Sequence, residues 1–194
     1  MTATIRSTTR HCTAQMRIAS PLGLLLLART DNGLAGAWFV DQKHHPQPID
    51  AAELGDDALL CRAADQLHAY FAGDAAGFDV PLDLHGTVFQ RAVWSELLRL
   101  ERGTTCSYGE IARRLGTPAA GRAVGAAVGR NPVSIIVPCH RVIGSTGALT
   151  GYAGGLDRKT ALLRIEAKVP FALLDRRWSG LDLGARGDVV VTAS

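Results

Sequence analysis

The sequence predicts a small α/β domain followed by a mainly helical domain that contains a helix-turn-helix. Short apolar runs separated by turn residues fill the first part of the chain, as in a small sheet. The second part contains two capping-box sequences and a Gly-Thr-Pro junction, which are signals for the ends of short helices. The charge divides in the same way: residues 1–85 contain six Lys and Arg against ten Asp and Glu, whereas residues 86–168 contain twelve against five. These observations place the domain boundary near residues 85 and 86.

We expect four parts along the 194 residues: a disordered tail (1–15), the α/β domain (16–85), the helical domain (86–168) and an extension of unknown role (169–194). Apolar residues make up 47% of the chain and charged residues 20%, which is typical of a soluble globular protein. No apolar run approaches the roughly 20 residues of a membrane-spanning helix. The four cysteines show no C-x-x-C spacing, which argues against a zinc ribbon or a disulfide scaffold and indicates a cytoplasmic protein.

The α/β domain is predicted to be a small antiparallel sheet with one helix. Residues 16–18, 22–28 and 34–40 have the length and apolar character of strands. Thr30-Asp31-Asn32-Gly33, between the last two, is a hairpin signal because Asn-Gly tolerates positive φ. Apolar residues recur at intervals of three and four between residues 57 and 71, which predicts an amphipathic helix that faces the core.

Two further features of this domain are weaker. Residues 80–84 predict an edge strand. The paired His44 and His45 suggest a metal site with Cys12 or Cys61, but their spacing matches no closed zinc site, so we favour a loop. We predict no catalytic residue in this domain.

The helical domain contains clear sequence signals for where its helices begin and end. Thr87-Val88-Phe89-Gln90 and Ser107-Tyr108-Gly109-Glu110 are capping-box sequences, and each is expected to open a helix. Gly116 then ends the second helix, Thr117 is expected to cap the next, and Pro118 takes a first-turn position in a helix that runs to about residue 128. Two short helices joined by a tight turn make a helix-turn-helix.

The helix predicted after Pro118 is unusual in composition. Up to Gly129, every residue except Arg122 is small or aliphatic. Such a helix has little side-chain bulk with which to read base edges, but it can approach a surface closely and present one guanidinium. Packing against neighbouring elements would explain the Ala and Gly residues but not Arg122. Together with the basic charge of residues 86–168, the pattern favours a DNA-facing helix.

A nucleophile is predicted after an apolar run. The β-branched residues 135–137 predict a short buried strand that Pro138 must end, which places Cys139 at a strand end. His140 and Arg141 follow, and their charge would favour the thiolate over the thiol, whose reference pKa is about 8.5. On these residues alone, a buried structural cysteine remains the alternative.

The end of the helical domain adds an acid and a glycine-rich loop. Residues 156–166 are predicted to form a terminal helix from which Glu166 could reach His140. An acid that orients a histidine beside a nucleophile follows the general logic of a catalytic triad. No Walker lysine follows residues 151–155, so a pocket wall of backbone amides and Tyr152 is favoured over a phosphate cradle.

The motifs of the second half occur in one order: S-Y-G-E-I-A with Tyr108, G-R-A-V-G with Arg122, N-P-V with Asn131, P-C-H-R-V with Cys139, and G-Y-x-G-G with Tyr152. In this combination the chain closely resembles the O6-alkylguanine-DNA alkyltransferases, also called methylated-DNA–protein-cysteine methyltransferases. The resemblance is strong over residues 86–168, weaker over 16–84 and absent from the last 26 residues. It implies a ribonuclease H-like N-terminal α/β domain followed by a mainly α winged helix-turn-helix domain.

The resemblance also implies a DNA repair activity with base flipping. An alkyl group would move from O6 of guanine, and from O4 of thymine, in double-stranded DNA to the protein's own cysteine in one suicidal turnover. Carried over by position, Cys139 is the acceptor thiolate, His140 the water-mediated base and Glu166 the acid that orients it. Tyr108 would donate toward guanine N3, and Asn131 would brace the turn before the cysteine. Methyl transfer to sulfur requires no metal or cofactor, and we expect a monomer with no membrane partner.

Further residues are implied on the DNA and in the base pocket. Arg122 would fill the stack vacated by the flipped nucleotide, with its helix in the minor groove. The other implied DNA contacts are Tyr108, Thr117, Ala123, Ala126 and Arg141. The implied pocket residues are Val142, Ser145, Tyr152, Ala153 and Gly154.

Two departures from the family pattern leave the preferred adduct size open: Ala153 stands where many relatives carry Ser, and Glu101 replaces a proline common before Gly103. Two other functions compete with repair. A non-enzymatic DNA-lesion-binding regulator on the same helix-turn-helix is disfavoured because such relatives lack the acceptor cysteine. A cysteine hydrolase that uses Cys139 and His140 would need repeated turnover, which a stable thioether forbids.

Overall fold

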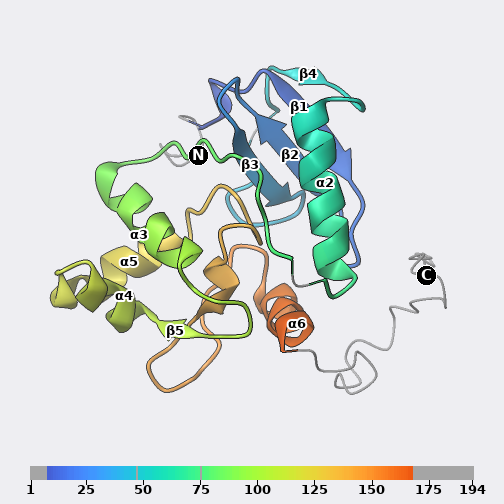
Figure 1. Cartoon of the computed structure of the whole chain (residues 1–194). Helices are drawn as coiled ribbons and strands as arrows, with labels where there is room; N and C mark the ends of the chain where they lie inside the picture. The colour runs from blue at the N-terminus through green and yellow to red at the C-terminus, as the bar shows by residue number, and fades with distance from the viewer. Residues whose placement is uncertain (1–7, 47, 75, 168–194) are drawn as a thin grey trace.

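The computed structural model describes residues 8–46, 48–74 and 76–167. Figure 1 shows a sheet crossed by the helix α2, and beside it a second group of elements that contains α3, α4, α5 and α6. This is the α/β domain followed by a mainly helical domain that the sequence predicts. No helix in these ranges is long and apolar enough to cross a membrane.

The sheet is built around a hairpin. Its strands are β1 (Ala14–Ile18), β2 (Leu25–Arg29), β3 (Leu34–Phe39) and the short β4 (Ala52–Glu53). β1, β2 and β3 are antiparallel, and β4 adds to β1 in parallel, in the order β3-β2-β1-β4. The predicted hairpin between β2 and β3 is formed, with the Thr30 N–H donating to the Gly33 carbonyl at 2.9 Å, but neither Asn32 nor Gly33 takes the expected positive φ.

The helix α2 (Ala58–Phe71) packs its predicted apolar stripe on the sheet. Asp57 caps it, since one carboxylate oxygen accepts from the N–H of Leu59 at 3.1 Å and of Leu60 at 3.0 Å. The same carboxylate pairs with Arg29 of β2 at 2.7 Å. One residue therefore starts the helix and ties it to the sheet.

Two expectations at the margins of this domain need correction. The edge strand over residues 80–84 is reduced to a single bridge between Leu82 and Leu34, and Pro81 beside it has no N–H for a ladder. The prediction of a disordered tail is wrong for residues 8–15. Ala14 already lies in β1, and Cys12 is buried, with its thiol bonded to the Thr8 carbonyl. Residues 1–7 of the predicted tail lie outside the described residues, as do residues 169–194.

The helical domain follows the predicted punctuation. Its helices are α3 (Val88–Leu98), α4 (Tyr108–Arg114), α5 (Gly121–Val128) and α6 (Leu156–Glu166), with a 3-10 turn, η1 (Pro118–Ala120), before α5. Both capping boxes are formed, at the starts of α3 and α4. Trp94 of α3 is fully buried, and its indole N–H donates to the Ala127 carbonyl of α5 at 3.0 Å. α4 and α5 are the two helices of the helix-turn-helix.

The start of the recognition helix α5 differs from the prediction. Thr117 makes no side-chain cap; its hydroxyl donates back to the Ala112 carbonyl at 3.4 Å. Pro118 lies in the tighter turn η1, which precedes α5 and leads into it at Gly121. The chain thus enters α5 through a 3-10 turn instead of through a capped α-helical end.

The strand predicted over residues 135–137 is wrong. These residues form turns, in which the Val137 N–H donates to the Val133 carbonyl at 3.0 Å and Ile135 has φ of 73°. Only Val133 pairs with the sheet, through a bridge to Ala37 of β3. The run is buried as expected, but a short apolar run buries equally well in a turn that is enclosed by other elements.

A second, two-stranded sheet joins distant parts of the helical domain. β5 (Cys106–Ser107) pairs in parallel with β6 (Val142–Ile143), which directly follows the 3-10 turn η2 (Cys139–Arg141). Because β5 leads into α4, this pairing brings the start of the helix-turn-helix next to the segment that carries Cys139.

Candidate functional site

Cys139 is held at the start of η2 by the side chain of Asn131. The Asn131 amide donates to the Cys139 sulfur at 3.0 Å and to the Val137 carbonyl at 2.7 Å, while its oxygen accepts from the Val133 N–H at 3.0 Å. Asn131 is itself buried at the end of the recognition helix. It therefore bonds both sides of the turn that carries Cys139.

The thiol of Cys139 is protonated at neutral pH in this DNA-free state. Cys139 is only 4% exposed, and burial raises its pKa to about 11, although the Asn131 bond and the charge of Lys159 act in the opposite direction. A neighbouring cation, Lys159, does favour the thiolate, but burial has the larger effect. Its cause is desolvation, which disfavours the charged form of a buried acid.

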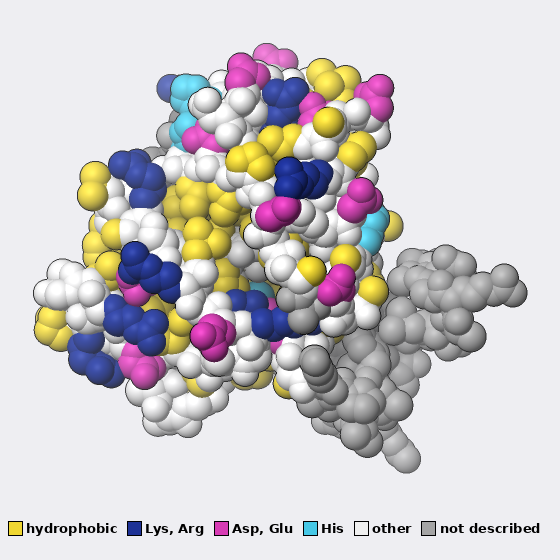
Figure 2. Space-filling model, viewed as in Figure 1, with side chains coloured by type: hydrophobic (Ala, Val, Ile, Leu, Met, Phe, Trp, Pro, Cys, Tyr) yellow, Lys and Arg dark blue, Asp and Glu magenta, His cyan; other side chains and the backbone are white. Residues whose placement is uncertain are grey.

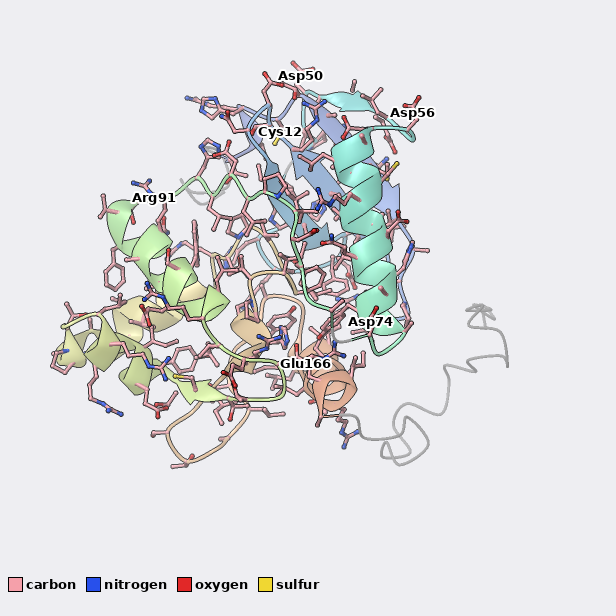
Figure 3. The ribbon with its side chains drawn as sticks, in the orientation of Figure 1. Cys12, Asp50, Asp56, Asp74, Arg91 and Glu166 are labelled. Atoms are coloured by element: carbon pink, nitrogen blue, oxygen red, sulfur yellow. The ribbon has the colours of Figure 1, made fainter. Side chains whose placement is uncertain are left out.

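Glu166 is the centre of a buried network at the end of α6. Figure 3 shows it below the C-terminal end of α2, where Asp74 is labelled. Its carboxylate accepts from His140 Nε2 at 2.8 Å, from Arg141 Nε and Nη2 at 2.8 Å each, from the Tyr70 hydroxyl at 2.9 Å and from the Gly103 N–H at 3.2 Å. Burial alone would raise the pKa of Glu166, but the bonds from His140 and Arg141 outweigh it and hold that pKa well below its usual range.

This carboxylate sets the tautomer of His140. An ionised carboxylate only accepts hydrogen bonds, so the proton lies on Nε2 and Nδ1 keeps its lone pair. Burial lowers the pKa of His140, which favours the neutral ring. Nδ1 is buried and has no hydrogen-bond partner among the described residues. The residue next to Cys139 therefore offers one unused proton-accepting nitrogen.

The placement of Arg141 corrects one predicted DNA contact. Its side chain is 11% exposed, its Nε and Nη2 bind Glu166, and its Nη1 donates to the Leu100 carbonyl. A guanidinium that is occupied by a buried carboxylate cannot reach a DNA surface. The sequence pattern missed this because the two residues of the ion pair are far apart in the chain.

The other predicted DNA-facing residues lie on one accessible face. Val124, Ala127 and Val128 bury one side of α5, which leaves the opposite side open. That open side carries Arg122, Ala123 and Ala126, and Thr117 precedes it; all four are exposed. Figure 2 shows further Lys and Arg side chains over α3 and α4, with acidic side chains among them. Tyr108 is half-buried, and its hydroxyl donates to the Thr150 and Gly151 carbonyls over 3.3 and 3.5 Å.

The predicted pocket wall is formed in part. Burial raises the pKa of Tyr152, and the charge of Cys139 acts in the same direction. Gly154 must lack a side chain, because an added Cβ would lie 2.7 Å from the Tyr152 ring. Val142 is buried, and the partly exposed Ala153 lies between the other two wall residues. Ser145 lies apart: it lines a separate cavity with residues of β5 and α4, and Cys139 does not line that cavity.

The sequence-based analysis missed two residues of the site. Lys159 is 0% exposed, and its ammonium donates to the Val142 carbonyl and, at 2.6 Å, to the Thr150 carbonyl. Burial lowers its pKa to about 8, while the charge of Cys139 raises it. Tyr70 comes from α2, in a domain where we predicted no catalytic residue. Residues 159, 162 and 166 share one face of a helix, so the position of a lysine on the face that carries Leu162 and Glu166 could have pointed to its burial.

Lys159 forms no ion pair within the described residues. Its positive charge lowers the pKa of the Cys139 thiol. We expect Lys159→Met to slow alkylation of Cys139 by iodoacetamide about tenfold near pH 7, since one pKa unit is about 1.4 kcal/mol. Lys159→Arg should retain most of the wild-type rate. Mass spectrometry of the Cys139 peptide over time measures both rates, and equal rates in the two variants would contradict the electrostatic role.

The site holds no evident metal ligands. Among the described residues, no group of three or more His, Cys, Asp or Glu side chains could hold a metal ion.

Comparison with known proteins agrees with this arrangement. The family model described as 6-O-methylguanine DNA methyltransferase, DNA binding domain, matches residues 88–168, and the ribonuclease-like domain of the same family matches residues 16–84. The methylated-DNA–protein-cysteine methyltransferase of Mycolicibacterium paratuberculosis is 50% identical over 151 residues, which cover 78% of this chain and 90% of the relative. That of Methanosarcina acetivorans is 48% identical over 147 residues, or 76% of this chain and 94% of the relative.

A solved structure extends the agreement to three dimensions. Mycobacterium tuberculosis OGT, crystallised in complex with DNA, matches with a TM-score of 0.75 and 48% identity over 80% of this chain and 94% of that one. Both domains of this chain thus have counterparts of the same family, in the same order. With its cysteine, histidine and glutamate brought together as described, the chain belongs to the 6-O-methylguanine DNA methyltransferase family, the methylated-DNA–protein-cysteine methyltransferases.

Proposed function

We propose that this protein repairs double-stranded DNA, as a monomer, by moving an alkyl group from O6 of guanine, or O4 of thymine, to Cys139. Each molecule reacts once, because the thioether product is stable. The single observation that supports this best is the arrangement around the sulfur: Asn131 bonds it, and the adjacent His140 has a free Nδ1 while Nε2 is fixed by Glu166. An accepting nitrogen is what a buried, protonated thiol needs before it can attack.

The proposed chemistry balances without a further reactant. The Cys139 thiol gives its proton to His140 Nδ1, directly or through one water. The sulfur then attacks the alkyl carbon, a new S–C bond forms, and the C–O6 bond breaks with its electron pair left on the guanine. The departing guanine takes up one proton in place of the one that His140 received, and the hydroxyl of the half-buried Tyr108 is the proposed donor at N3. Within the described part of the chain, that hydroxyl bonds only the Thr150 and Gly151 carbonyls, over 3.3 and 3.5 Å.

Base flipping follows from the burial of the sulfur. Cys139 is 4% exposed, so an alkyl carbon inside a stacked duplex cannot reach it. The exposed face of α5 is short-chained and can approach the minor groove closely, and Arg122 on that face can enter the vacated stack. Extrusion costs a few kcal/mol, which an inserted side chain partly offsets.

The test is a stoichiometric transfer assay. We expect a duplex oligonucleotide that carries O6-methylguanine to lose one methyl group per protein molecule, with a mass increase of one methyl on the Cys139 peptide. Sustained multiple turnover would indicate a hydrolase, and tight binding without transfer would indicate a non-enzymatic lesion binder. A methyl group found on another residue would also overturn the proposal.

The Arg122→Ala variant should separate the base-flipping step from the alkyl-transfer step. We expect it to slow repair of O6-methylguanine in a duplex by about tenfold or more, because the vacated stack is left unfilled at a cost of a few kcal/mol. Reaction with the free base O6-benzylguanine needs no extrusion and should change less than about twofold. Arg62→Ala, which removes an exposed arginine from α2, is the matched charge control. Equal losses on both substrates would contradict the wedge role.

A further inference from the structure

The glycine-rich loop over residues 151–155 is attached to the N-terminal domain through Arg158. Arg158 lies on α6, two residues beyond the start of that helix. Its Nη1 donates to the Gly154 carbonyl of the loop at 3.1 Å, while its Nε donates to the Leu22 carbonyl at 2.7 Å. Its Nη2 lies 2.8 Å from Asp41, so one guanidinium joins the loop to two segments of the N-terminal domain.

The packing around this guanidinium is close. It lies over the Phe39 ring, with 4.4 Å from its central carbon to the ring centroid, and its side chain is 17% exposed. Gly23 faces it with φ of 115°, and a Cβ there would come within 3.0 Å of Nη2. A planar fork that forms three polar contacts and one stacking contact is specific to arginine, because the ammonium of lysine cannot span all of them.

A second connection holds the same loop independently of Arg158. The Lys43 N–H of the N-terminal domain donates to the Ala153 carbonyl at 2.9 Å. Phe39 also closes on Gly154, where an added Cβ would meet its ring at 3.3 Å. The N-terminal domain and Arg158 therefore support the Ala153 and Gly154 part of the predicted pocket wall, which also includes Tyr152.

We propose that Arg158 is a positioning residue that fixes this wall, so that the N-terminal domain sets which alkyl adducts the pocket accepts. This inference rests on the proposed alkyl transfer. A glycine-rich loop has many backbone states, and each external contact removes some of them. A fixed wall favours the smallest adduct, since a larger group must displace it. Ala153 has no hydroxyl to fix the loop from within, so Arg158 and Lys43 hold the carbonyls of residues 154 and 153, while Tyr108 bonds that of Gly151.

The test compares adducts of two sizes in the same duplex. We expect Arg158→Met to slow transfer from O6-methylguanine about tenfold, because a loosely held wall no longer positions the base. Transfer from O6-benzylguanine should fall by less than about twofold, since the relaxed wall admits the larger group. The methyl-to-benzyl rate ratio should therefore drop about fivefold or more. Arg158→Lys should lie between the wild type and Arg158→Met.

A second measurement does not depend on alkyl transfer. Hydrogen exchange of the peptide that contains residues 151–155 should become faster in Arg158→Met, before any DNA is added. Arg17→Met is the matched control: it removes an arginine from an ion pair with Glu53 on β1 and β4, away from the loop, and should alter neither the rate ratio nor the exchange.

The outcomes separate this inference from the proposed function. If the wild type transfers neither adduct, the proposed function fails, and the exchange measurement still decides whether Arg158 holds the loop. If the wild type transfers both adducts and Arg158→Met keeps the same rate ratio, the inference is overturned. A loss of rate that is equal for both adducts and matches a loss of folded protein would likewise overturn it.

Discussion

Cys139→Ser should abolish alkyl transfer, with a fall in rate on the order of 10⁴-fold or more. A serine hydroxyl is far less nucleophilic than sulfur and ionises at much higher pH, so the unused nitrogen of His140 cannot activate it enough. Binding to the damaged duplex should persist, because the exposed face of α5 is unchanged. The rate follows from loss of the methyl label from the duplex, and binding from a gel-shift titration.

Cys61→Ser is the control for this prediction. Cys61 is partly exposed and lies on α2, so it is more accessible to reagents than the buried Cys139. We expect the Cys61 variant to transfer at the wild-type rate. Transfer that survives in Cys139→Ser but disappears in Cys61→Ser would refute the assignment of the acceptor.

Glu166→Gln should both slow the reaction and destabilise the fold. The change leaves Arg141 buried without its charged partner, and removal of one member of a buried pair costs about 3–5 kcal/mol. It also releases the His140 tautomer, so transfer should slow by about 10²-fold or more, the usual worth of a positioned proton acceptor. Urea unfolding curves and single-turnover rates measure the two effects separately.

The pH dependence of stability follows from the same residue. The pKa of Glu166 is held below its ordinary value of 4.5 in the folded protein. Its stabilisation is therefore fully present above about pH 4.5 and is lost as the pH falls through the depressed folded value. The pKa of His140 is lowered from its ordinary value of 6.5. The unfolded chain therefore binds this proton more readily, and the folded state also loses stability as the pH falls below 6.5. We expect wild-type stability to decline in acid and Glu166→Gln to show a flatter decline.

A double variant distinguishes loss of the ion pair from general damage. Arg141→Met combined with Glu166→Gln removes the uncompensated guanidinium, and should be more stable than Glu166→Gln alone. Its transfer rate should nevertheless remain low, because His140 still lacks its orienting carboxylate. A double variant that is no more stable than Glu166→Gln would argue that Arg141 is not the source of the destabilisation.

Elements with local causes were predictable from the sequence. A capping box needs only residues three apart, and both boxes, with the helices α3 and α4 that they open, form as predicted. The hairpin between β2 and β3 also forms, although neither Asn32 nor Gly33 takes the positive φ that was the reason for predicting it. The strand predicted over residues 135–137 does not form. The conformation of this segment is set by the Asn131 side chain and by contacts of the adjoining residues with Ala37, and neither appears in the local apolar pattern.

The candidate site was predictable to the extent that it rests on motifs. Cys139, His140 and Asn131 come together because they are close in the chain, and Glu166 was found from triad logic. Tyr70 was missed because α2 lies nearly a hundred residues away, and only the packing of the two domains brings its hydroxyl to Glu166. Lys159 and Arg158 were missed because an isolated basic residue on a helix is normally solvated.

The sequence by itself determined the order of the domains, the choice of Cys139 as the candidate acceptor and the small-residue face of α5, because each depends on residue types at short spacing. Only the tertiary structure decided the protonation of Cys139, the loss of Arg141 from the DNA surface and the connection of the pocket wall to the N-terminal domain. The physical reason is that pKa values and ion pairs depend on burial and on distances through space. Spacing along the chain specifies neither of them.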